Sequence, residues 1–362
     1  MSIIDRIKKA KVSLQAGDLP YIPHPPELGG FTKVFPGRLK GDVTCVTGST
    51  GSAKTSLTKY LIFKAIEWAI KNNKNYHVIW FGLEESKEQF EFTLLSWLLY
   101  KESRGKTRYN IEHFEGLGKT VNDADLPYIE LMEDTFDKFM SYVSFHDLTL
   151  NSFGIYKEVR DFARSRGTFY YKNTPLTLED LQAQRKWDRY QATDEKEYIE
   201  VVVDHISLLT VQKDEKDTRE AMTNLLKHLR IHAAKMFKYS VVIVQQQALE
   251  MENLDHIKEK YVYASVQGLG NNKELSRDYL NIIGITNINK VGIKIAEVEN
   301  GSINVSGLQD FQRVIGILKR RYGKANKKYL TYFDGCVGWF HEIDVLNIQK
   351  YTEQIKKYET ED

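Results

Sequence analysis

The chain has 362 residues, 42% of them hydrophobic, so it can bury the core of one large α/β domain with a small appendage. This composition excludes a disordered or fibrous protein. Its 51 basic and 49 acidic residues leave a formal net charge of +2, so no overall positive field favours nucleic acid or an anionic membrane. Any polyanion must therefore bind at a local patch.

The compartment is indicated by the two cysteines, Cys45 and Cys336, which match no metal-ligand spacing. Two separated thiols without a disulfide pattern favour a reducing compartment, and we expect a cytoplasmic protein. No run reaches the roughly 18 apolar residues of a membrane span, so we expect no membrane partner.

The N-terminal region is predicted to lie outside the core. Isoleucines among lysines give residues 1–20 an amphipathic, helix-like pattern. The stretch from Pro20 to Pro26 is rich in proline and predicts an extended connector. We therefore assign residues 1–27 to an N-terminal helix and linker, and residues 28–342 to the core domain.

Strand and helix patterns alternate through the core. An apolar strand, Val43–Thr47, is followed by a Gly-rich turn and a helix, and then by the strand Tyr76–Leu83. Ser86 to Gln89 fits a capping box that opens the next helix. This order predicts a mostly parallel central sheet. Further strands are predicted at Tyr142–Phe145, Ile199–Val203, Ser240–Val244 and Asn281–Ile288.

The pattern near the C-terminus is antiparallel. Asn300-Gly301 between alternating apolar residues signals a hairpin, and Val314–Leu318 with Tyr329–Phe333 predicts an antiparallel pair. Residues 343–362 are interpreted as a helical tail. Two polar, charge-rich segments are interpreted as irregular surface insertions in the core, at residues 101–138 and 168–197.

The strongest motif follows the first core strand. It reads Gly48-Ser49-Thr50-Gly51-Ser52-Ala53-Lys54-Thr55 and stands between a strand and a helix, as a phosphate-binding loop requires. Backbone N–H groups of such a loop surround an anion at the positive helix end. Lys54 would contact the β- and γ-phosphates of a nucleoside triphosphate, and the Thr55 hydroxyl would bind Mg²⁺. The alternative is a Gly/Ser-rich turn that happens to precede a lysine.

One residue departs from the usual motif. Ala53 occupies the position before the lysine where glycine is usual, and its Cβ is placed where the backbone bends around phosphate. Because alanine is the smallest substitution, we expect a working loop with slightly altered geometry.

Acidic residues follow two of the predicted strands. Asp204 ends the strand Ile199–Val203 at the carboxyl edge of the sheet, where it would hold Mg²⁺ directly or through water. An aspartate that merely caps a turn is the alternative. Glu84 and Glu85 follow another strand, and either could orient and deprotonate the attacking water. A glutamate before a helix is also a routine partner of the helix dipole, so spacing alone does not decide.

The order of these motifs resembles that of the DnaB-type hexameric replicative helicases of bacteria and phages, which have a RecA-like fold. Gly82-Leu83-Glu84 is similar to the family's Ser-Leu-Glu motif, which implies that Glu84 is the catalytic base. The segment that starts at Asp204 is similar to its Asp-Tyr-x-x-Leu segment. Val241-Val-Ile-Val-Gln-Gln246 is similar to the strand that ends in a γ-phosphate sensor, which implies this role for Gln246, with Gln245 as the alternative.

The resemblance continues to a basic strand end. Ile317-Leu-Lys319-Arg-Arg321-Tyr-Gly323 is similar to the family's Lys-x-Arg-Asn-Gly, whose Lys and Arg reach the nucleotide of a neighbouring subunit. It implies catalytic roles in trans for Lys319 and Arg321. The run from Lys319 to Lys328 could instead bind a phosphate backbone or form a solvated hairpin.

Candidate contacts with single-stranded DNA lie between the sensor strand and Arg277. Gly268 to Ile283 resembles the segment after the family's DNA-binding loop, but it lacks the arginine of the Asp-Leu-Arg-x-Ser-Gly pattern. Cations, amides and aromatics are mixed here as in single-strand binders, although such residues are also ordinary in loops. The candidates are Lys258, Lys260, Asn271, Asn272 and Lys273.

The resemblance covers residues from about 28 to 342. It implies an ATP-dependent replicative helicase, with ATP and Mg²⁺ as cofactors, that moves 5′ to 3′ on single-stranded DNA as a homo-oligomeric ring, a hexamer in this family. A primase, a polymerase or a helicase loader would be its partners. Because the helical N-terminal domain of about 100 residues is not seen before the core, we expect a phage-like form in the host cytoplasm. Two other interpretations are a RecA-like recombination or strand-annealing ATPase that forms filaments, and a nucleotide-binding structural protein without turnover.

Overall fold

The computed structural model describes residues 2–148, 151–182, 186–248, 263–272 and 275–361. Its centre is a nine-stranded sheet with the order β16-β15-β14-β11-β3-β10-β9-β4-β5. From β11 to β5 neighbouring strands run parallel, whereas β14, β15 and β16 are antiparallel to their neighbours. The predicted α/β fold, with a mostly parallel sheet and antiparallel C-terminal strands, is confirmed.

Eight of the nine strands of the sheet lie within a few residues of a predicted strand, whereas β16 was not predicted. Residues of β3, β9 and β11 are all buried, which explains why apolar residues predominate in their sequences. The parallel strands are β3 (Val43–Gly48), β4 (Tyr76–Gly82), β5 (Val143–His146), β9 (Tyr198–Asp204), β10 (Ser240–Gln246) and β11 (Asn281–Thr286). The antiparallel strands are β14 (Gln312–Arg320), β15 (Lys327–Asp334) and β16 (Trp339–Glu342).

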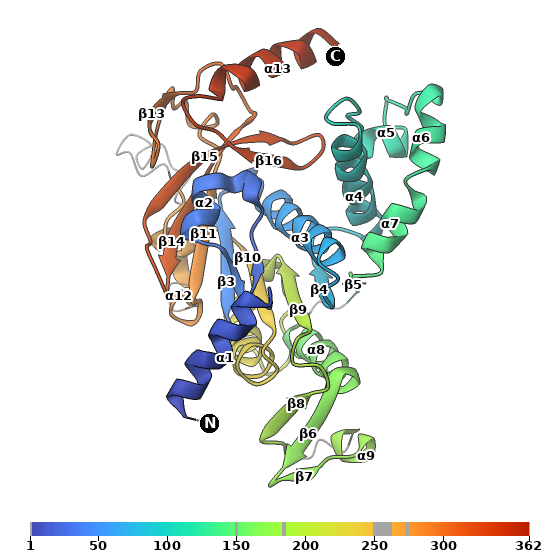
Figure 1. Ribbon diagram of the computed structural model, residues 1–362, viewed down its shortest axis with the longest axis vertical. Coiled ribbons are helices and arrows are strands. Elements are labelled where there is room, and N and C mark those ends of the chain that lie inside the picture. The colour runs from blue at the N-terminus through green and yellow to red at the C-terminus, as the bar shows by residue number, and fades with distance from the viewer. Residues whose placement is uncertain (1, 149–150, 183–185, 249–262, 273–274, 362) are drawn as a thin grey trace.

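Helices cover both faces of this sheet (Figure 1). Val202 of β9 belongs to the apolar cluster that contains α3 and α4, whereas Val201 and Val203 belong to the cluster with α8 and α10. Alternate side chains of one strand therefore pack on opposite helical layers. The helices are α3 (Lys54–Lys71), α4 (Lys87–Glu102), α8 (Ser152–Arg166) and α10 (Thr218–His228), which continues as the π-helical η4 (Leu229–Met236).

Two lobes project from the core in Figure 1, and they coincide with the two predicted insertions. They were expected to be irregular but contain short helices and a three-stranded sheet with the order β7-β6-β8. Elements of two to eight residues are too short to show periodicity in a polar sequence. The first lobe has α5 (Ile111–Glu115), η2 (Asp123–Asp125), α6 (Leu126–Glu130) and α7 (Glu133–Met140). The second has β6 (Gly167–Tyr171), β7 (Thr174–Pro175), α9 (Leu178–Gln182) and β8 (Arg189–Ala192).

The remaining elements lie near the termini and in connections. They are α1 (Ile3–Gln15), β1 (Tyr21–Pro23), η1 (Pro26–Leu28), α2 (Gly29–Val34), β2 (Gly37–Leu39), η3 (Ile206–Leu208), η6 (Gln267–Asn272), α12 (Leu275–Asp278), β12 (Ile295–Val298), β13 (Gly301–Asn304) and α13 (Ile348–Glu361). The pairing of β12 with β13 confirms the hairpin signal at Asn300-Gly301. In Figure 1, α13 lies at the top of the molecule and α1 lies in its lower half.

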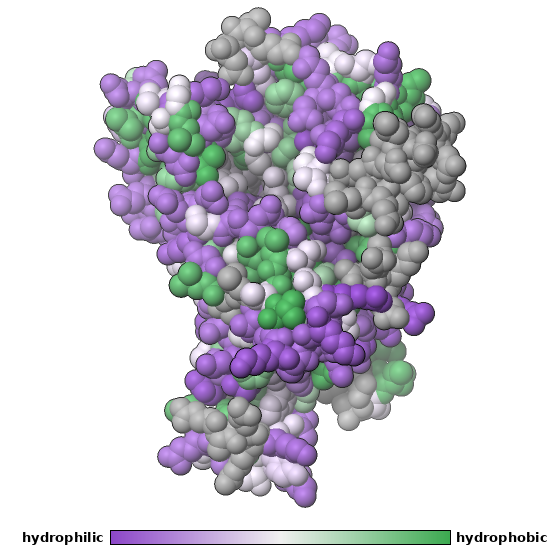
Figure 2. Space-filling view, turned by 180° about the vertical axis from the view of Figure 1, so that it is seen from behind, coloured by the Kyte–Doolittle hydropathy of each residue, from purple (hydrophilic) through white to green (hydrophobic). Residues whose placement is uncertain are grey.

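The face of the molecule in Figure 2 is largely polar. Figure 2 shows one face of the molecule on which hydrophilic residues predominate and hydrophobic ones form small separate patches. Helix α1 differs, because more than half of the surface of each of its large apolar side chains is exposed. The exposed fraction is 74% for Ile3 and 64% for Val12. Within the described ranges, no helix is long and apolar enough to cross a membrane.

Candidate nucleotide-binding site

The register of the parallel strands gathers the predicted motifs at one edge of the sheet. Gly48 of β3 pairs with Gln246 of β10, and Asp204 of β9 pairs with Gly82 of β4. Because β9 and β10 are also neighbours, all four strand ends lie side by side. This is the carboxyl edge, where open α/β sheets bind their ligands.

The loop between β3 and α3 has the geometry that a bound phosphate needs. A Cβ on Gly48 would lie 2.2 Å from the carbonyl oxygen of Ile285, so only glycine fits there. Gly51 and Ala53 have positive φ angles of 72° and 76°. Helix α3 begins at Lys54, so its N-terminal end faces the loop. An anion bound there would accept hydrogen bonds from backbone N–H groups, and the positive end of the helix dipole would attract it.

Ala53 retains the left-handed backbone that glycine usually supplies. We expect Ala53→Gly to raise the free energy of unfolding by up to about 1 kcal/mol. The left-handed region costs an L-residue about 1–2 kcal/mol, and the freedom of glycine in the unfolded chain offsets part of this. Urea unfolding measures the change.

A matched control is available two residues earlier. Gly51 has nearly the same φ, and a Cβ added there meets no atom within 4 Å. Gly51→Ala should therefore lower the free energy of unfolding by about 1 kcal/mol through backbone strain alone. A less stable Ala53→Gly protein would show that the alanine is not strained.

Lys54 and Gln246 both contact the phosphate loop. Lys54 is 8% exposed, and its Nζ donates to the Ser49 carbonyl at 2.9 Å. Gln246 Nε2 donates to Thr50 Oγ1 at 2.5 Å. Gln245 points into the core, where its Oε1 accepts from the Tyr279 hydroxyl at 2.7 Å. Of the two glutamines, Gln246 is therefore the one that contacts the phosphate loop.

Asp204 and Thr55 form a pair that fits Mg²⁺. Thr55 Oγ1 donates to Asp204 Oδ1 at 3.2 Å, while Asp204 Oδ2 is buried and has no hydrogen-bond partner. Burial, with the nearby charge of Glu85, raises the pKa of Asp204 to about 7. A divalent cation would compensate this buried charge, and Mg²⁺ takes its other ligands from phosphate and water. Accordingly, the described residues contain no group of three or more His, Cys, Asp and Glu that could hold a metal by themselves.

The structure separates the two candidate bases. Glu85 is mostly buried and forms an ion pair with Lys59 of α3, and burial raises its pKa. The Glu84 side chain is 61% exposed, and its Oε2 lies 3.6 Å from His205 Nε2. Burial lowers the pKa of His205, so its ring is neutral at pH 7 and does not neutralise Glu84. Glu84 is therefore the carboxylate that is available to water.

Lys290 is a residue at this site that the sequence did not reveal. Its Nζ donates to the Thr50 carbonyl at 3.1 Å, which places a positive charge at the phosphate loop of its own chain. It follows β11, which is the other neighbour of β3 in the sheet. Only the strand order identifies it, because a lysine after a strand is no signal by itself.

Lys319 and Arg321 lie at the opposite edge of the sheet. Lys319 pairs with Ile282 near the start of β11, and the charge of Arg321 acts on Asp42, which precedes β3. The six residues of β3 span about 20 Å. Neither side chain therefore reaches the phosphate loop of its own chain. Lys319 Nζ donates to the carbonyls of Ser276 and Tyr279 at 2.6 and 2.7 Å, whereas Arg321 is exposed.

The candidate DNA contacts are only partly described. Lys258, Lys260 and Lys273 lie outside the described residues. Asn271 and Asn272 end the short 3-10 helix η6. This helix is joined to the end of β10, because the Ala248 N–H donates to the Gly268 carbonyl at 2.8 Å. The segment therefore adjoins the strand that carries Gln246.

Comparison with known proteins supports the fold. No protein-family model and no curated protein match the chain. A solved ATPase domain is similar over 95% of this chain and 99% of its own, with a TM-score of 0.66 and 13% identity. The structure of a DnaB-like replicative helicase, described with its interactions with primase, is similar over 95% of this chain and 67% of its own, with a TM-score of 0.63 and 12% identity. At this identity the likeness establishes the fold: the chain has the RecA-like architecture of P-loop ATPases, as the motif order predicted.

Proposed function

We propose that this protein is an ATP-dependent replicative helicase that moves along single-stranded DNA as a ring of identical subunits. The observation that carries the proposal is the division of the candidate site between two edges of one sheet. The phosphate loop, Asp204 and Glu84 lie at one edge, and Arg321 lies at the other. Such a site is complete only when the second edge of a neighbouring copy faces the first.

This contact joins different surfaces of two copies, so it closes into a ring or continues as a filament. Three features support the ring. The basic strand end resembles that of the hexameric helicases, and the fold is shared with a DnaB-like replicative helicase. In addition, α1 exposes Ile3, Ile7 and Val12, which a neighbouring subunit would cover.

Each residue at the carboxyl edge has a defined role in hydrolysis. Lys54 would bind the β- and γ-phosphates. Thr55 and Asp204 would hold Mg²⁺, which when bound would supply positive charge to the transferred phosphoryl group. Glu84 orients the attacking water and accepts its proton. Arg321 of a neighbour stabilises the charge of the transition state.

A structural route connects hydrolysis with DNA. Gln246 contacts the phosphate loop, and the next residues, Gln247 and Ala248, contact the segment with η6. Gly268 lies so close to Gln247 that a Cβ on it would be 2.3 Å from Gln247 Oε1. Loss of the γ-phosphate would shift Gln246 and, through this tight packing, the segment that holds Asn271 and Asn272. The 5′ to 3′ polarity and a primase, polymerase or loader partner rest on the family resemblance.

The test is triphosphate hydrolysis by the purified protein with and without single-stranded DNA, together with its mass in solution. We expect a six-subunit particle whose turnover is strongly stimulated by DNA and abolished by Glu84→Gln. Glu88→Gln, at an exposed position on α4, should leave turnover unchanged. Turnover indifferent to DNA would reject the helicase, and DNA-dependent filaments would favour a recombination ATPase. Binding without turnover would favour a structural protein.

A further inference from the structure

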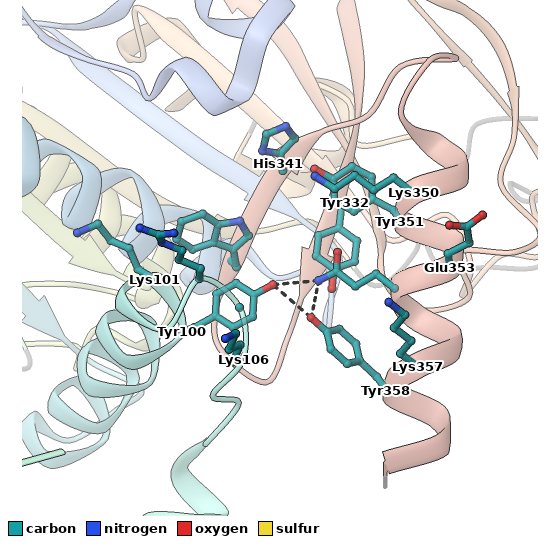
Figure 3. Close-up of a pocket in the computed structure, with 14 residues that line it drawn as sticks. Tyr100, Lys101, Lys106, Tyr332, His341, Lys350, Tyr351, Glu353, Lys357 and Tyr358 are labelled. Atoms are coloured by element: carbon teal, nitrogen blue, oxygen red, sulfur yellow. Dashed lines mark hydrogen bonds between the residues drawn. The ribbon is translucent and has the colours of Figure 1, made fainter. Parts of the chain in front are cut away.

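A second cavity lies outside the nucleotide site. It has a volume of about 710 Å³ and lies between the end of α4, the segment that follows it, and helix α13. Figure 3 shows Tyr100 and Lys106 on one side and Lys350, Lys357 and Tyr358 on the other. Helix α4 begins beside Glu84 and has 16 residues, a length of about 24 Å. The cavity is therefore far from the candidate catalytic edge.

The charge of the cavity is strongly positive. Five lysine and arginine side chains line it, against the single carboxylate of Glu353. Lys101 is neutralised by Glu67 and Glu102, but among the described residues Arg104, Lys106 and Lys350 form no salt bridge. Since the whole chain has a formal net charge of only +2, this local excess is not a consequence of composition. Uncompensated cations around a cavity attract an anion.

The floor of the cavity consists of tyrosine side chains that are held by hydrogen bonds and ring stacking. Gln354 Nε2 donates to the Tyr100 hydroxyl at 3.2 Å, and the Tyr100 and Tyr358 hydroxyls lie 3.3 Å apart. The rings of Tyr332 and Tyr351 are stacked at 4.7 Å. This packing fixes α13 against the sheet, so the cations on the two sides are held at a defined separation. These tyrosines are buried, so they position the cations and leave recognition to the charges.

The spacing of the cations indicates the size of the ligand. Lys350 and Lys357 are seven residues apart on α13, so they lie on the same face, about 10.5 Å from each other. Arg104 and Lys106 extend the positive charge to the opposite side. One phosphate cannot contact all of them. We infer that the cavity binds the phosphate backbone of a single-stranded nucleic acid, outside the loops that the family resemblance assigns to DNA.

This inference rests on the proposed function for the identity of the polyanion, and its test is direct binding. Arg104→Gln, Lys106→Gln and Lys350→Gln are combined, and binding of a fluorescent oligothymidylate is followed by anisotropy with Mg²⁺ and a non-hydrolysable ATP analogue. We expect a loss of affinity of at least about tenfold near 100 mM salt. The slope of log K against log salt should fall by about 2, since each phosphate contact on a single strand contributes about 0.7.

Two controls separate a site from bulk charge. Lys213→Gln, Lys227→Gln and Lys235→Gln remove the same charge from exposed positions elsewhere and should leave the affinity nearly unchanged. Lys106→Arg with Lys350→Arg keeps the charge and should keep the binding. Thermal unfolding checks that every variant is folded.

Each outcome is decisive. Unchanged oligothymidylate binding by the triple variant, or an equal loss in the control triple, overturns the inference. Binding of inorganic tripolyphosphate is measured as well. If the triple variant loses tripolyphosphate binding and keeps oligothymidylate binding, the cavity is a small-anion site and the inference is overturned. If DNA stimulates turnover of the wild type and the triple variant still binds oligothymidylate normally, only this site is rejected. If the triple variant loses oligothymidylate binding as expected but DNA does not stimulate turnover of the wild type, only the helicase is rejected.

Discussion

Two inactive variants, Glu84→Gln and Arg321→Ala, are expected to recover hydrolysis when they are mixed. Each alone lacks one part of every composite site, and loss of a trans-acting arginine costs about 10³–10⁵ in turnover. In a mixed ring, an Arg321→Ala subunit keeps Glu84 and receives Arg321 from a Glu84→Gln neighbour. Random mixing makes about one interface in four intact, so up to about a quarter of the wild-type rate should return.

The result depends on subunit exchange, which an affinity tag on one variant can verify. If mixed particles form and hydrolysis does not return, Glu84 and Arg321 do not act across an interface, and the site would have to be complete in one chain. The geometry argues against this, because β3 separates the two edges by about 20 Å. Lys319→Ala is the companion variant. Because Lys319 Nζ is engaged by the Ser276 and Tyr279 carbonyls, this change should lower stability more than turnover.

The phosphate loop and Asp204 were predictable because they depend on local sequence. A Gly-rich turn between a strand and a helix specifies its own geometry, and a residue at the end of a parallel strand is placed at the ligand edge by the fold class. The choice between Glu84 and Glu85 is different. It depends on Lys59 of α3, which forms an ion pair with Glu85, whereas the side chain of Glu84 is exposed to solvent. Spacing within the motif contains no information about this contact.

Features that depend on strand order or on distant segments were not predictable. Lys290 reaches Thr50 only because β11 lies beside β3, an adjacency that one sequence does not specify. The second cavity joins the segment after α4 to α13, which are separated by most of the chain. No motif in the sequence connects its cations. The three-stranded lobe likewise forms by pairing of β6 with β8 across α9, and both strands are short and polar.

Asp204 should make the metal-free protein less stable as the pH rises. Its pKa is raised by burial from 3.8 to about 7, so the folded chain keeps a proton that the unfolded chain has already lost. The contribution of Asp204 to the free energy of unfolding therefore falls between about pH 4 and pH 7, by about 4 kcal/mol in total, and it is measured as the difference in stability between the wild type and Asp204→Asn. Asp204→Asn removes this dependence, and in a chelator at pH 8 the variant should be more stable than the wild type.

The same substitution should abolish the response to Mg²⁺. In the wild type, Mg²⁺ with a non-hydrolysable ATP analogue binds the ionised carboxylate, so it should raise stability more at pH 8 than at pH 5. Asp204→Asn should show no such gain, and its turnover should fall by more than about 100-fold, since a bound metal supplies several kcal/mol. Urea unfolding from pH 5 to pH 8 measures this, with Asp214→Asn on the surface as control. If the difference in stability between the wild type and Asp204→Asn does not change with pH in the chelator, Asp204 is ionised without metal, and its neighbours already compensate the buried charge.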